Sequence, residues 1–161
     1  MTEKEMFLNT WKQEHETLMK VLKAFPEDKL DMKIAEKLRT PKELSWVFVT
    51  EQGILNGALD GNIDFSNLPR IPATYEEILS TLEANHKKLM AKVKKLKPKQ
   101  WNQKVMWMAG PGKTKKIRAA DVAWFTLMDR VHHRGQFSVF LRLAGAKVPS
   151  IYGPSADDPW M

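Results

Sequence analysis

The sequence contains no cysteine, and this absence excludes several functional classes. A disulfide scaffold, a cysteine-ligated zinc or iron–sulfur site and a cysteine nucleophile all need thiols that the chain lacks. No apolar run approaches the roughly 20 residues of a membrane span. Charged residues are scattered through residues 1–16, where a signal peptide needs an apolar core. We therefore expect a cytoplasmic protein with no membrane span.

The chain has 161 residues, and we expect it to form one domain over 1–161. It contains 19 acidic residues, but none of them lies in residues 84–120. The basic stretch 87–118 predicts a phosphate-binding surface for nucleic acid or another anionic surface. The alternative is a solvated face, with lysines that suit the C-terminal end of a helix. Only Trp101 and Trp107 are interleaved with the cations, and no RNA-binding motif occurs, so nucleic acid is the less favoured partner.

Three threonine-led motifs predict where helices begin. Residues 2–5, 40–43 and 74–77 each place a threonine three positions before a glutamate, which is the pattern of a capping box. Apolar residues then recur at steps of three and four, which is typical of one buried helix face. The expected faces are Phe7, Trp11, His15, Leu18, Leu22 and Phe25; Leu44, Val47, Phe48, Glu51, Ile54, Leu55 and Ala58; and Ile78, Leu82, Asn85 or His86, Leu89, Val93 and Leu96.

A fourth helix is predicted from about residue 118 to residue 144. Its expected inward face is Val122, Phe125, Asp129, His132 or His133, Gln136, Phe140 and Leu143. Residues 67–72 and 100–116 are expected to be irregular, with a short strand or flap at residues 105–108, and residues 148–154 are too rich in proline and glycine for a helix. The predicted fold is therefore all-α: a four-helix bundle with long connecting loops and an extended C-terminal tail.

Polar residues interrupt the predicted apolar faces, and burying them costs free energy unless they are paired or bind a ligand. Asp129 and His133 are four residues apart and share one helix face, so together they can bind a divalent metal. The alternative is an Asp–His hydrogen bond that orients a core histidine. Two other classes are disfavoured: Gly112-Lys113-Thr114 lacks the earlier glycine of a phosphate-binding loop, and no Gly-x-Ser-x-Gly motif of a serine hydrolase occurs.

The C-terminal third carries a more specific pattern. Residues 128–136 read MDRVHHRGQ, residues 141–145 read LRLAG, and residues 148–157 read VPSIYGPSAD; residues 40–47 read TPKELSWV. Together they resemble the DinB/YfiT-like superfamily, over nearly the whole chain. The resemblance implies a four-helix bundle, often dimeric, with a divalent metal held by one histidine of the second helix and by a His-x-x-x-His pair of the last. It also implies thiol-dependent transferases or isomerases among the relatives.

The sequence departs from that metal site at two of its three positions. Val47 stands where the second-helix histidine is expected, and Asp129 replaces the first histidine of the pair, while His133 is kept. His132 lies about 100° away around the helix and is not expected to bind the same ion. Glu51 lies one turn after Val47 and can supply a carboxylate, so we expect a degenerate site of Glu51, Asp129 and His133 for zinc, nickel or manganese. This harder set of ligands favours manganese, iron or zinc over a soft metal; the remote His15 is a further candidate.

Four other residues of the resembling segments are assigned to a ligand pocket or to a structural role: Trp46, Arg134, Gln136 and Tyr152. For Arg134 we expect a carboxylate partner such as Glu51 or Asp157. For Gln136 we expect a hydrogen bond to a helix end or to the tail. The tail around Tyr152 is expected to fold back over the end of the bundle, where its aromatic ring can line a pocket or a dimer contact.

Three functions remain open from the sequence. The first is a metal-dependent enzyme acting on small molecules, such as a thiol transferase. The second is a metal-free protein of the same fold that binds a small ligand or serves as a dimeric scaffold in a stress response, since Val47 favours a filled, apolar position. The third is a binder of nucleic acid or of an anionic surface through residues 87–118. We expect a homodimer in the first two cases.

Overall fold

The helices begin at the three predicted capping boxes. The computed structural model describes residues 1–66 and 68–160, so Asn67, at which the expected 67–72 loop begins, lies outside the described residues. Thr2, Thr40 and Thr74 each accept a hydrogen bond from the backbone amide three residues later, and the glutamate there accepts one from the threonine amide. These bonds start α1 (Glu3–Lys23), α2 (Pro41–Asp60) and α3 (Tyr75–Lys95).

The remaining elements are shorter, except for the last helix. A 3₁₀ turn, η1, spans Glu27–Lys29, and one turn of helix, α4, spans Pro98–Trp101. Strands β1 (Lys104–Gly110) and β2 (Lys113–Arg118) then lead into α5 (Ala119–Leu143). At the end of α2, Gly61 adopts a φ of 90°, which a glycine reaches without the steric penalty of a side chain, so the helix ends at Asp60.

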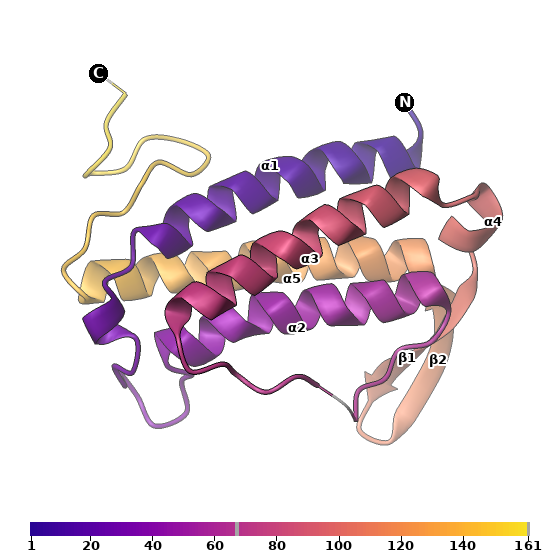
Figure 1. Ribbon diagram of the computed structural model, residues 1–161, viewed down its shortest axis with the longest axis horizontal. Helices are drawn as coiled ribbons and strands as arrows, with labels where there is room; N and C mark the ends of the chain where they lie inside the picture. Colours follow the sequence, from indigo (N-terminus) through magenta and orange to yellow (C-terminus); the bar gives the residue numbers. More distant parts are fainter. Residues whose placement is uncertain (67, 161) are drawn as a thin grey trace.

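The four long helices run alongside one another (Figure 1). Helix α2 packs against α3 and α5, and α1 packs against the same two helices. All six residues of the expected α1 face are buried, and on α3 His86 rather than Asn85 points inward. At roughly 25 cal/mol per Å² of apolar area, burial of these faces is the main favourable contribution to folding. The chain is thus mostly helical, and no helix in its described part is long and apolar enough to cross a membrane.

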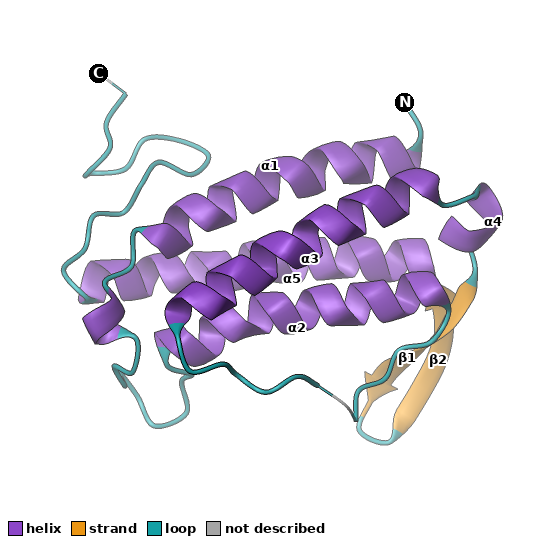
Figure 2. Ribbon diagram, in the orientation of Figure 1, coloured by secondary structure: helices purple, strands orange, loops and turns teal. Residues whose placement is uncertain are grey.

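A small antiparallel sheet corrects the all-α expectation (Figure 2). Strands β1 and β2 pair from Lys104↔Arg118 to Gly110↔Lys113, with an irregular register between Met108 and Gly110. The segment 105–108 is therefore part of a strand. Val105 is the buried residue of β1 and packs with Ala58 and Val122, which fixes the hairpin against the α2–α5 end. Most of the remaining side chains of both strands are exposed or half-exposed.

The expected inward face of α5 is partly wrong. Three of its residues are exposed: Phe125, Gln136 and Leu143. The fully buried positions of α5 instead include Arg130 and Arg134, which were not part of the predicted inward face. Helix α5 is only weakly amphipathic because two of its inward positions are charged, so the spacing of apolar residues predicts only part of its buried face, which includes Val122 and Phe140. Both arginines can be buried because each contacts polar or aromatic groups in the protein interior.

Candidate metal and substrate site

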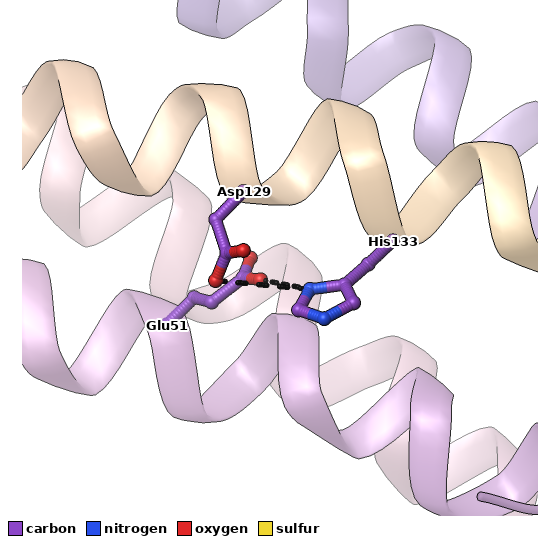
Figure 3. A group of neighbouring side chains, drawn as sticks. All are labelled: Glu51, Asp129 and His133. Carbon is purple, nitrogen blue, oxygen red and sulfur yellow. Dashed lines mark hydrogen bonds and ion pairs between the residues drawn. The ribbon is translucent and has the colours of Figure 1, made fainter. Parts of the chain in front are cut away.

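Three polar side chains converge between α2 and α5 (Figure 3). Glu51 comes from the middle of α2, and Asp129 and His133 lie one turn apart on α5. One ligand atom of each lies within 4.8 Å of the others. His133 Nδ1 is 2.9 Å from Glu51 Oε1 and 3.8 Å from Asp129 Oδ2. The packing of α2 against α5 thus brings together the three residues expected at the degenerate site, although Glu51 and His133 are 82 residues apart in sequence.

Val47 occupies the position of the expected second-helix ligand and takes no part in this group. Its side chain is half-buried and packs against the apolar core formed by α1, α2, α3 and α5. Glu51, one turn later on the same helix, reaches His133 instead. The Glu51 carboxylate therefore lies at the contact between α2 and α5, where the resemblance implied the imidazole of a second-helix histidine.

Burial controls the ionisation of this group. Glu51 is 4% exposed, and desolvation raises the pKa of its carboxyl, although His133 and Arg130 both oppose the shift. The hydrogen bond with Glu51 raises the pKa of His133, against the effect of its own partial burial. Because both pKa values move upward, each group holds its proton to a higher pH than the free side chain would.

The geometry leaves coordination capacity at Glu51. Its Oε1 accepts the hydrogen bond from His133, but its buried Oε2 has no hydrogen-bond partner within residues 1–66 and 68–160. Oε2 lies 3.8 Å from Arg130 Nε, which is an ion pair without a hydrogen bond. Two carboxylates and one imidazole are a donor set that manganese, iron or zinc accepts, so the residues present fit a divalent metal. The side chain of Asp129 is 36% exposed, so the group is open to solvent on one side.

Arg130 is the residue that sequence reasoning missed. Its side chain is fully buried, lies 4.1 Å above the ring of Trp11, and donates from Nη2 to the carbonyl of Phe48 at 3.3 Å. Burial lowers its pKa to about 10, and the charge of Glu51 opposes this change. A positive charge beside Glu51 offsets part of the cost of burying that carboxylate. Its position directly after Asp129 could have pointed to a role at the site, but arginine side chains are usually exposed, so the sequence alone did not predict its burial.

His15 belongs to a different cluster. Its Nε2 is 2.8 Å from Glu83 Oε2, and its ring stacks on that of His86 with centroids 3.7 Å apart. Desolvation lowers the pKa of both histidines, that of His86 to about 4. His15 is not part of the group formed by Glu51, Asp129 and His133.

The tail is connected to the core by Arg134. Its guanidinium forms an ion pair with Glu14 on α1 and donates to the hydroxyl of Tyr152, which lies 2.9 Å from Glu14 Oε2. The expected carboxylate partner is therefore confirmed, but it is Glu14, 120 residues earlier in the sequence, and neither of the two named examples, Glu51 and Asp157. Asp157 pairs with Arg142 instead. We call the Glu14–Arg134–Tyr152 group the tail latch.

The other two residues assigned to a pocket or a structural role, Gln136 and Trp46, also have hydrogen-bond partners. Gln136 is exposed and bonds His132 at 3.0 Å, so the expectation of a helix end or the tail is wrong. Trp46 is buried and donates from its indole nitrogen to the carbonyl of Pro69 at 2.9 Å, which connects α2 to the segment before α3.

The basic stretch 87–118 is divided among several elements. Its lysines and arginine lie on the last part of α3, on α4 and on the hairpin. Three of its cations already pair with acidic residues: Lys87 with Glu83 at 3.6 Å, Lys92 with Asp60 at 2.7 Å, and Arg118 with Glu3 and Asp121 at 3.2 and 2.6 Å. Part of this charge therefore stabilises local structure.

Comparisons with known proteins agree with this fold. The chain is 27% identical over 154 residues to the uncharacterized protein YrdA of Bacillus subtilis (strain 168), covering 94% of this chain and 89% of that protein. Among solved structures, a DinB-like protein from Bacillus cereus ATCC 10987 aligns with a TM-score of 0.76 at 21% identity, covering 92% and 97% of the two chains. The DinB-like protein YjoA of Bacillus subtilis aligns with a TM-score of 0.73 at 17% identity, covering 91% and 97%.

These two structural similarities concern the fold alone, because both identities are low. The sequence profile of the DinB family, in contrast, matches residues 1–160. This match over nearly the whole chain shows that the chain belongs to the DinB family.

Proposed function

We propose that the protein binds a divalent metal through Glu51, Asp129 and His133 and uses it in a small-molecule transfer reaction, with a thiol as the favoured substrate class. The observation that carries this proposal is the buried Oε2 of Glu51, which has no hydrogen-bond partner in the described residues and lies in a group of three ligand atoms within 4.8 Å. A buried carboxylate oxygen left without a donor is costly, and a cation would satisfy it.

The residues around the group have separable roles in this proposal. Glu51 and Asp129 supply negative charge, and His133 supplies a ring nitrogen once its proton has left. Arg130 stays charged at neutral pH and holds the Glu51 carboxylate by an ion pair of 3.8 Å. A bound divalent metal would supply Lewis acidity, lowering the pKa of a thiol that reaches it. The half-exposed Asp129 marks the side from which such a substrate would approach.

A metal-free ligand-binding protein is the second candidate. The Glu51–His133 hydrogen bond and the Arg130 ion pair favour it, because together they satisfy much of the local charge without an ion. In either case we propose a single cytoplasmic domain over 1–161 that forms a homodimer. Phe125 and Met128 are exposed on α5 near the hairpin and are candidate dimer contacts.

Elemental analysis of protein purified without a histidine tag tests the metal. The protein is incubated with zinc, nickel or manganese, desalted and compared with Asp129→Asn, His133→Asn and the matched control His132→Asn, an exposed histidine one position away. We expect about one ion per chain, lost in the first two variants and kept in the control. A chain that retains no ion with any of the three metals contradicts the proposal and favours the metal-free protein.

Thiol chemistry needs its own measurement. Cobalt-loaded protein is titrated with glutathione while the visible absorption is followed, because a thiolate that binds cobalt gives an intense charge-transfer band. We expect this band in the parent protein and its loss in Asp129→Asn. Metal retention without the band would keep the metal site and remove the thiol as substrate class.

A further inference from the structure

An apolar groove lies along the same α2–α5 seam that holds the metal-binding group. It encloses about 600 Å³, within the range of small-molecule sites. Its apolar lining comes from the segment between η1 and α2, from α2 and from the last turns of α5: Ile34, Leu38, Leu44, Val139, Phe140 and Leu143. Four of these six, Ile34, Leu38, Val139 and Leu143, are more than 40% exposed, so the groove presents apolar surface to solvent.

The polar part of the lining carries one sign of charge. Lys37, Arg39 and Gln136 complete it, and no acidic residue lines the groove in the described part of the chain. Neither Lys37 nor Arg39 belongs to an ion pair among the described residues. An apolar surface beside two unpaired cations matches an amphipathic anion better than a neutral or cationic ligand.

The groove is close to the metal-binding group. Leu44 precedes Glu51 by seven residues and Phe140 follows His133 by seven, so the two sites are separated along the seam by two helical turns, about 10 Å.

A second copy of this chain fits the groove less well. A copy that docked the same surface against itself would bring Lys37 and Arg39 toward their own counterparts, and the groove offers no carboxylate to offset them. Phe125 and Met128, the exposed apolar residues nearer the hairpin, are outside the lining.

From this combination we infer that the groove binds a small amphipathic anion, such as a medium-chain carboxylate, with its chain on Leu44, Val139 and Phe140 and its anionic group at Lys37 and Arg39. As the substrate site of an enzyme the groove rests on the proposed metal function, since it would deliver a substrate to the group of Glu51, Asp129 and His133. Binding itself needs no metal and can be measured separately.

Isothermal titration with decanoate, below its micelle concentration and in EDTA, tests the inference. Decanol and decyltrimethylammonium serve as neutral and cationic probes of the same chain length. We expect saturable decanoate binding, at least tenfold tighter than either probe. Equal affinity for the cationic probe, or no saturable binding, would overturn the inference.

Matched variants locate the binding. Lys37→Gln/Arg39→Gln should weaken decanoate at least tenfold, while Lys113→Gln/Lys115→Gln, which removes the same charge from the hairpin, should leave it unchanged. Val139→Asp should abolish binding, and Met6→Asp, an exposed apolar residue of α1, should not. If Val139→Asp converts a dimer into a monomer by light scattering and leaves decanoate binding intact, a second copy occupies the groove and the inference fails.

The same titration with Asp129→Asn separates this inference from the metal. Retained decanoate binding in a variant that no longer holds an ion would support the groove independently of the metal, and decanoate binding by a parent protein that retains no ion would contradict only the metal function. Loss of decanoate binding in Asp129→Asn, with the fold intact by circular dichroism, would place the ligand at the metal-binding group and overturn the groove assignment.

Discussion

His133 donates from Nδ1 to Oε1 of Glu51 across the α2–α5 seam at 2.9 Å, and this bond determines how the group must respond to a metal. The pKa of His133 is raised because the hydrogen bond with Glu51 favours its charged form, so the ring holds its proton to a higher pH than a free histidine would. A cation that used the ring nitrogen would have to displace that proton.

Metal binding should therefore release a proton. At pH 6, below the raised pKa of His133, we expect about one proton released per ion, and an affinity that increases about tenfold per pH unit until the histidine is neutral. Titration calorimetry in two buffers of different ionisation enthalpy measures the proton count. His132→Asn should behave like the parent protein, and an affinity independent of pH would show that His133 is not a ligand.

The tail latch should make a large contribution to stability. Glu14→Gln leaves the 1%-exposed Arg134 without its carboxylate, and we expect a loss of about 3 kcal/mol in the free energy of unfolding. Tyr152→Phe removes only a hydroxyl and should cost about 1 kcal/mol. Urea denaturation measures both effects. Glu16→Gln, an exposed position on the same helix, serves as control, and a Glu14→Gln effect as small as the control's would contradict a structural role.

The stacked histidines should make the protein sensitive to acid. Burial lowers the pKa of His86 to about 4, below the value near 6.5 expected when unfolded, so the unfolded chain binds more protons between these two values. Stability is thus fully present above pH 6.5 and falls as the pH is lowered through this window, by about 1–2 kcal/mol at pH 5. Urea denaturation at pH 7.5 and 5 measures this loss, which His86→Phe should reduce; an unchanged loss would assign the acid sensitivity to other groups.

Two helical glycines should respond to alanine in opposite directions. A Cβ at Gly135 would meet no atom within 4 Å, so Gly135→Ala should stabilise α5 by about 1 kcal/mol. A Cβ at Gly57 would lie 2.6 Å from the backbone oxygen of Asn62, so Gly57→Ala should destabilise. Thermal melting of both variants provides the comparison, and a destabilised Gly135→Ala would indicate that α5 contacts a partner there.

What the sequence determined by itself is local. Threonine and glutamate three residues apart fix the helix starts because the hydrogen bonds of a capping box form within one turn. Asp129 and His133 share a face of α5 because four residues complete about one turn. The inward face of α1 follows the apolar spacing for the same reason.

The tertiary structure decided which side of α5 turns inward and which partners the buried charges find. Arg134 meets Glu14 rather than Glu51 or Asp157, and Arg130 stacks on Trp11, because α1 packs against α5 across more than a hundred residues of sequence. The spacing of side chains within one helix carries no information about charges on another helix. Only the packing of α1, α2 and α5 could bring Glu51 to His133 and leave its second oxygen without a hydrogen-bond donor in the described residues.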